Sequence, residues 1–117
     1  MITASSEKIE EDARRLIEKG YRTIKLKVGR HSLNEDIVAV KALRTTAGNG
    51  TEIRLDANRA WSLKEAVSFG KSVADCRIQY IEEPLKEAAD LTQFFKQTGI
   101  PFALDESLVG QFPNCLM

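Results

Sequence analysis

The sequence predicts an α/β fold, in which four parallel strands alternate with helices as part of a (β/α) barrel of the TIM type. Helical and strand-like patterns alternate along the chain, and this order is typical of βα units around a parallel sheet. The predicted strands are apolar on one face only, whereas a sheet covered by helices on both faces would have strands that are apolar throughout. A barrel, with its helices on the outside, fits this pattern better.

The first predicted helix and strand lie at the beginning of the chain. Apolar residues recur at helical spacing over residues 7–19, with Ser6 as the N-cap and Gly20 as the stop. A β-favouring run follows at residues 23–28 and ends at Gly29.

Two capping boxes mark the next helices. Ser32 is followed three residues later by Glu35, and Ser62 by Glu65, which places a helix start at each serine. The earlier of these helices is predicted to run to about Ala47. The other predicted elements are strands at 52–56, 78–82 and 101–105 and a helix after Pro84 that carries Leu91, Phe94 and Phe95 and ends at Gly99.

Charged residues gather at the carboxyl ends of the predicted strands. Strand side chains alternate between two faces, so Ile24 and Leu26 point one way while Lys25 and Lys27 point the other. The carboxyl ends of parallel strands form the active-site rim in barrels and in open sheets alike. The charged residues predicted to meet there are Lys27, Asp56, Glu82 and Asp105.

The three carboxylates predict a metal site. Asp56, Glu82 and Asp105 would repel one another unless a cation lay among them. Oxygen ligands favour a hard ion such as Mg²⁺, with Mn²⁺ as a substitute. Zinc is not favoured, because the single histidine, His31, follows Gly29 in a loop and no cysteine lies near a strand end.

The two lysines predict a base beside that metal. A lysine that is partly desolvated and close to another cation has a lowered pKa and can accept a proton near neutrality. Lys25 and Lys27 share the face of Asp56, so this pair suits removal of a proton α to a carboxylate. Taken alone, a Lys-x-Lys strand is more often a solvated face, and an Asp that closes a strand is usually a turn residue. The recurrence of charged residues at strand ends about one βα unit apart favours a functional site.

Four motifs resemble the successive strand-end motifs of the enolase superfamily, which pairs a lysine base with Mg²⁺. They are Lys25-Leu26-Lys27, Asp56-Ala57-Asn58-Arg59-Ala60-Trp61, Ile81-Glu82-Glu83-Pro84 and Leu104-Asp105-Glu106-Ser107. The similarity runs from about Glu7 to Leu108 and is closest to the o-succinylbenzoate synthase family, although related epimerases and cycloisomerases have similar strings. It implies Mg²⁺-dependent syn-dehydration of a small-molecule carboxylate, 2-succinyl-6-hydroxy-2,4-cyclohexadiene-1-carboxylate, in menaquinone or phylloquinone biosynthesis.

The resemblance also implies a role for each matching residue. Lys27 would be the catalytic acid/base, and Lys25 its neighbour at the substrate carboxylate. The metal ligands would be Asp56, Glu82 and Asp105, with Asn58 and Arg54 as supporting residues.

The chain also departs from the family pattern. Superfamily enzymes have a capping domain and a complete barrel with a further lysine on the sixth strand, whereas the strands here match the second to the fifth. We therefore expect residues 1–108 to be a partial catalytic barrel domain, residues 109–117 an irregular tail, and the chain an enzyme fragment that is inactive alone and associates through its open sheet edges. The alternatives are an enzyme of the dipeptide epimerase or muconate cycloisomerase type and a non-catalytic half-barrel remnant.

Composition narrows the class of protein. The 117 residues carry 17 basic and 17 acidic side chains, which argues against a nucleic-acid binder and against a polybasic membrane-surface protein. No apolar run approaches the ~20 residues that span a bilayer. The N-terminus lacks the features of a secretory signal, and the 2 cysteines do not make a disulfide framework, so a cytoplasmic location is expected.

Overall fold

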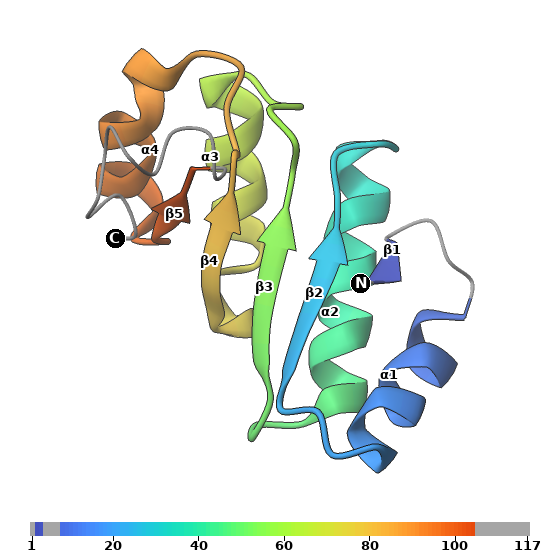
Figure 1. The fold of residues 1–117 in the computed structure, drawn as a ribbon. Coiled ribbons are helices and arrows are strands. Elements are labelled where there is room, and N and C mark those ends of the chain that lie inside the picture. Colours follow the sequence, from blue (N-terminus) through green and yellow to red (C-terminus); the bar gives the residue numbers. More distant parts are fainter. Residues whose placement is uncertain (1, 4–7, 105–117) are drawn as a thin grey trace.

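A single parallel sheet organises the part of the chain that the computed structural model describes, residues 2–3 and 8–104. Its strand order is β1-β2-β3-β4-β5, and every neighbouring pair is parallel. The elements are β1 (Ile2–Thr3), α1 (Ile9–Glu18), β2 (Thr23–Lys27), α2 (Leu33–Ala47), β3 (Glu52–Asp56), α3 (Leu63–Ser72), η1 (Ala74–Cys76), β4 (Ile78–Glu82), η2 (Ala88–Asp90), α4 (Leu91–Thr98) and β5 (Phe102–Ala103). In Figure 1, α2 and α3 lie behind the strands, α1 lies at the right beside α2, and α4 lies at the left near β5.

The four predicted strands are all present, and β1 adds a two-residue strand beside β2. The strand predicted at 101–105 is shorter in the structure, where β5 covers Phe102–Ala103. Asp105 and the predicted tail at 109–117 lie outside the described residues. Within residues 8–104, no helix has the length and apolar character needed to cross a membrane.

The helix starts follow the predicted capping to different degrees. At α3 both halves of the capping box form: the Ser62 hydroxyl accepts from the Glu65 N–H at 3.2 Å, and the Glu65 carboxylate accepts from the Ser62 N–H at 3.0 Å. At α2 the Ser32 hydroxyl accepts from the Glu35 N–H at 3.1 Å, while the Glu35 carboxylate lies 3.9 Å from His31 Nδ1.

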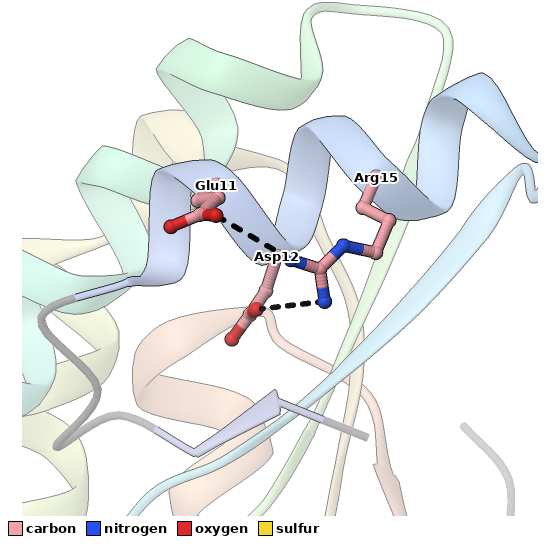
Figure 2. Close-up of polar contacts among 3 residues, drawn as sticks. All are labelled: Glu11, Asp12 and Arg15. Atoms are coloured by element: carbon pink, nitrogen blue, oxygen red, sulfur yellow. Dashed lines mark hydrogen bonds and ion pairs between the residues drawn. The ribbon is translucent and has the colours of Figure 1, made fainter.

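Helix α1 begins without a side-chain cap. Lys8 occupies its N-cap position in place of the predicted Ser6, which lies outside the described residues. Exposed ion pairs lie along this helix instead, and Figure 2 shows Arg15 between Glu11 and Asp12, with nitrogen–oxygen distances of 3.4 and 4.0 Å. Such exposed pairs contribute little to stability individually.

The core lies between the sheet and its helices. On the helix-facing side of β2 and β3, Ile24, Leu26, Ile53 and Leu55 are fully buried. The alternate residues of these strands are half-buried, except for Glu52, which is exposed, and they include the predicted site residues. The predicted separation of the sheet into one apolar and one charged face is therefore confirmed for β2 and β3.

A bulge in β4 preserves the same separation there. Ile53 pairs with Ile78, but the next residue, Arg54, pairs with Tyr80, so one extra residue of β4 stands between the two pairs. A bulge of this kind lets two residues three positions apart face the same side. Ile78 and Ile81 are consequently both buried, and Glu82 is brought into line with Asp56.

Candidate active site at the carboxyl ends of the strands

Three predicted site residues stand in one row across the sheet. Lys27 is the register partner of Asp56, and Asp56 is the partner of Glu82, so they occupy the last positions of β2, β3 and β4. The arrowheads of these strands point the same way in Figure 1. Adjacent strands are about 4.8 Å apart, so the structure brings the three residues together as the spacing of the motifs predicted.

The row beneath carries Lys25, Arg54 and Tyr80 as successive register partners. The Lys25 side chain extends out of this row toward the carboxylates, and its Nζ donates a 2.8 Å hydrogen bond to Glu82 Oε2. The side chains of this ion pair are 33% and 22% exposed. Lys25 thus contacts the carboxylate of β4 from a strand two positions away.

The surroundings of Lys25 favour its charged form. Burial lowers the pKa of Lys25, but the hydrogen bond to Glu82 and the charges of Glu82 and Asp56 outweigh burial, so the pKa is raised. Lys25 therefore lacks the lowered pKa that a lysine base needs near neutrality, because the two neighbouring carboxylates favour its charged form. Lys25 is an ammonium suited to binding an anion.

Asp56 is held by the turn that follows it. The backbone N–H of Asn58 donates to Asp56 Oδ1 at 3.0 Å, and Asn58 has a φ of 49°. Asparagine tolerates this left-handed conformation better than most residues. Asn58 therefore supports Asp56 through its backbone.

Arg54 lies away from the carboxylate row. Its Nε donates to Gln79 Oε1 at 2.6 Å, and its guanidinium carbon lies 5.2 Å from the centre of the Tyr80 ring. A second nitrogen is 3.9 Å from Glu52 Oε2. The structure thus places Arg54 against Gln79, Tyr80 and Glu52, and its supporting role stays a prediction.

Arg59 and Glu83 join the loops that follow β3 and β4, and neither was singled out from the sequence as a site residue. The Arg59 N–H donates to the Glu83 carbonyl at 2.7 Å, and Arg59 Nε donates to Glu83 Oε2 at 2.8 Å. Their φ angles are 61° and 49°, a left-handed conformation that costs a non-glycine residue roughly 1–2 kcal/mol. The sequence feature that could have pointed to this pair is the second acid of the Glu-Glu-Pro motif, which is Glu83.

The loop after β2 is fixed by a buried carboxylate. Asp36 on α2 is fully buried, and its Oδ2 accepts from the Gly29 N–H at 3.0 Å. Gly29 has a φ of 88°, and a Cβ there would lie 2.6 Å from the Ala60 Cβ and 2.8 Å from the Ala57 oxygen. Gly29 therefore allows the loops after β2 and β3 to touch just beyond Lys27 and Asp56.

The ligand atoms that the described residues offer at the strand ends suit a hard divalent cation. Asp56 and Glu82 offer only oxygen, and a positive charge, the Lys25 ammonium, already lies against Glu82. Among residues 8–104 no group of three His, Cys, Asp or Glu side chains forms a complete metal site. The third predicted ligand, Asp105, lies outside the described residues. Two carboxylates with an ammonium beside them can bind a cation and an anionic substrate together.

A separate small cavity of about 230 Å³ lies beside the end of β4, between Arg59, Glu83, Leu91 and Leu104. None of the predicted site residues lines it. This cavity therefore belongs to the packing of the β4–α4 loop.

Comparison with known proteins gives one family. The family described as "Enolase C-terminal domain-like" matches residues 8–113. The protein "PHYLLO, chloroplastic" of Arabidopsis thaliana is 43% identical over 104 residues, which are 88% of this chain and 6% of that protein. The o-succinylbenzoate synthase of Pasteurella multocida is 38% identical over 93 residues, 77% of this chain and 27% of that enzyme.

Epimerases match this chain at a similar sequence identity. The hydrophobic dipeptide epimerase of Enterococcus faecalis is 37% identical over 100 residues, 81% of this chain and 28% of that enzyme. Among solved structures, a substrate-liganded L-Ala-D/L-Glu epimerase from Bacillus subtilis has a TM-score of 0.80 at 31% identity, over 91% of this chain and 32% of that one. A dipeptide epimerase from Cytophaga hutchinsonii, complexed with Mg and D-Ala-L-Val, has a TM-score of 0.79 at 30% identity, over 91% of this chain and 30% of that one. The chain thus spans less than a third of the length of these relatives.

Proposed function

The chain belongs to the enolase C-terminal domain-like family, and we propose that its strand ends form one wall of the active site of an o-succinylbenzoate synthase. The substrate would be 2-succinyl-6-hydroxy-2,4-cyclohexadiene-1-carboxylate, which loses water to give o-succinylbenzoate. The observation that carries the proposal is the row of Lys27, Asp56 and Glu82 in register on three adjacent strands. The 38% identity with the Pasteurella synthase supports this choice of reaction.

In the proposed reaction the two lysines have different tasks. The amine of Lys27 takes the proton from the carbon α to the substrate carboxylate and then returns it to the departing hydroxyl, which leaves as water. The raised pKa of Lys25, which the nearby carboxylates cause against the effect of burial, keeps it an ammonium that binds the substrate carboxylate. One acid/base group can thus serve both halves of a syn-elimination.

Asp56 and Glu82 would hold Mg²⁺ together with Asp105. The metal would supply positive charge beside the substrate carboxylate and so stabilise the negative charge that develops there. The contribution of the chain is to hold both carboxylates at adjacent strand ends, with Asp56 oriented by the Asn58 N–H. The related Cytophaga structure is complexed with Mg, which supports magnesium as the ion.

Epimerisation of a dipeptide is the second candidate. The 37% identity with the Enterococcus enzyme and the TM-score of 0.80 with the Bacillus epimerase favour it. Both candidates begin with removal of an α-proton, and they differ in the next step: the hydroxyl leaves as water in the dehydration, whereas a proton is delivered to the opposite face of the same carbon in the epimerisation. Product analysis therefore separates them.

The test is an assay of the protein that carries this chain, with Mg²⁺ and each substrate in turn. We expect o-succinylbenzoate to form, and to cease forming in EDTA and in the Lys27→Ala variant. A dipeptide in D₂O provides the comparison: exchange of its α-hydrogen without formation of o-succinylbenzoate from the other substrate would favour the epimerase. Activity with neither substrate would favour the non-catalytic alternative.

A further inference from the structure

We propose that Arg59 and Glu83 form a positioning pair, which sets the carboxylates of Asp56 and Glu82 relative to each other. The pair joins the two loops that begin immediately after these carboxylates. This inference rests on the proposed function only for its measurement of metal binding, because the effect on the two carboxylates can also be measured without metal.

The pair holds the two loops by backbone and side chain together. The Arg59 N–H donates to the Glu83 carbonyl at 2.7 Å, and Arg59 Nε donates to Glu83 Oε2 at 2.8 Å. The pairing continues two residues further on, where Trp61 forms a bridge with Leu85. The contact is therefore a continuation of the sheet beyond its last regular residues.

Glu83 also connects this contact to β5. Its N–H donates to the Ala103 carbonyl at 2.8 Å, and its side chain is only 8% exposed, whereas that of Arg59 is 53% exposed. A buried carboxylate is costly unless it is paired, and Arg59 supplies that partner. Glu83 thus ties the carboxyl ends of β3, β4 and β5 together.

Backbone strain is concentrated at the same place. Asn58, Arg59 and Glu83 have φ angles of 49°, 61° and 49°, and they account for three of the four non-glycine residues with positive φ among those the structure describes. Strained conformations persist only where the surrounding contacts hold them, and they cluster at functional sites. At both loops the strained residues follow a carboxylate at the end of a strand.

The carboxylates are linked to the pair through short backbone paths. The Ala57 N–H donates to the Glu82 carbonyl at 3.0 Å, and the Asn58 N–H donates to Asp56 Oδ1 at 3.0 Å. Glu82 directly precedes Glu83. If the pair is lost, the turns can relax from their left-handed conformations, and the two carboxylates lose their common alignment.

The test uses the full chain with Mn²⁺ as the probe. The affinity for Mn²⁺ is measured by electron paramagnetic resonance, and the side-chain carboxyl ¹³C shifts of Asp56 and Glu82 are measured by NMR without metal. The variants are Arg59→Ala, Glu83→Ala and Glu83→Gln, since the glutamine keeps an oxygen that can accept from Arg59 Nε. Arg15→Ala is the matched control, because Arg15 also forms ion pairs but lies on α1 (Figure 2).

We expect Arg59→Ala and Glu83→Ala to weaken Mn²⁺ binding by about 10-fold or more, the range typical of residues that orient metal ligands. Glu83→Gln should stay close to the parent chain, and Arg15→Ala should match it. Equal loss in Glu83→Gln and Glu83→Ala, or no loss in Arg59→Ala, would overturn the proposal. If Glu83→Ala does not fold, Arg59→Ala decides the test, because the Arg59 side chain is half exposed and its loss disturbs packing less.

The NMR readout separates this proposal from the proposed function. If the unaltered chain takes up no Mn²⁺, the metal site has failed in this chain, and the positioning pair is judged by the carboxyl shifts alone. Changes at Asp56 and Glu82 in Arg59→Ala that are absent in Arg15→Ala would support it. Unchanged shifts in Arg59→Ala would overturn it.

Discussion

The ammonium of Lys25 on β2 donates a 2.8 Å hydrogen bond to Glu82 on β4, across the intervening strand β3. One oxygen of a proposed metal ligand therefore already contacts a cationic side chain. In the proposed site a divalent cation and Lys25 would compete for this carboxylate oxygen. An ammonium displaced from Glu82 by the metal would be available to the substrate carboxylate.

Replacement of Lys25 should change metal binding and turnover in opposite directions. Lys25→Met removes a positive charge beside Glu82, so the affinity for Mg²⁺ should rise by about 5-fold, the equivalent of the ~1 kcal/mol that a partly exposed ion pair contributes. Turnover should fall, because the substrate carboxylate loses its partner. Titration calorimetry on the chain tests the first effect, and weaker Mg²⁺ binding in Lys25→Met would contradict the competition.

Lys27 should be required for proton transfer. Lys27→Ala should lower the turnover of the protein that carries this chain by ~10²–10⁴-fold, the usual contribution of a general acid/base. Lys27→Arg should not restore it, because a guanidinium stays protonated near neutrality. Steady-state kinetics measure the turnover of both variants, and circular dichroism checks that they fold. Near-normal turnover in Lys27→Ala would show that another group is the base.

Local patterns in the sequence predict much of this fold. The predicted bounds of β3 and β4 agree with the structure because each strand lies between clear turn or helix signals. The capping box at Ser62 forms in full because both of its partners are close in sequence. The row of Lys27, Asp56 and Glu82 follows from strand periodicity and the spacing of βα units.

Contacts between distant segments could not be predicted in this way. The Lys25–Glu82 pair joins residues 57 positions apart, and it raises the pKa of Lys25 against the effect of burial. The bulge in β4 and the burial of Glu83 depend on the register and on the loops that pack beside them. Alternation of apolar residues carries no information about either.

Gly29 should tolerate a side chain much less well than Gly99. Both have positive φ, 88° and 71°, but a Cβ at Gly99 meets nothing within 4 Å, whereas at Gly29 it would meet Ala57 and Ala60. Gly99→Ala should cost about 1 kcal/mol from the backbone alone, because Gly99 lies in the left-handed region. Gly29→Ala should cost roughly 2–4 kcal/mol because overpacking is added. Urea denaturation of both variants measures the difference, and equal costs would contradict the close approach of the two loops.

Asp36 should make stability depend on pH. Burial raises the pKa of Asp36 above its ordinary value of 3.8, although the Gly29 hydrogen bond opposes the shift. The folded state therefore holds this proton more tightly than the unfolded state, and the contribution of Asp36 to stability falls as pH rises from about 3.8 through the folded-state pKa.

The variant Asp36→Asn isolates this effect, because asparagine does not titrate. The free energy of unfolding of the parent chain minus that of Asp36→Asn should decrease across this window, by at most about 1.4 kcal/mol per pH unit, and be constant above it. Urea denaturation of both proteins between pH 3 and pH 7 measures it. A difference that rises with pH would show that the Gly29 hydrogen bond dominates over burial.

We propose that Asp56 and Glu82 hold a divalent cation at the ends of β3 and β4, and the assigned reaction depends on this claim. Its most direct test is titration calorimetry of Mg²⁺ into the chain and into two variants that each remove one carboxylate charge from β3. Asp56→Asn changes the carboxyl end of that strand, and Glu52→Gln changes its other end. We predict that Asp56→Asn weakens Mg²⁺ binding strongly, since Mg²⁺ relies on few carboxylates, and that Glu52→Gln leaves it unchanged. Equal Mg²⁺ affinity in the parent chain and in Asp56→Asn would contradict the claim.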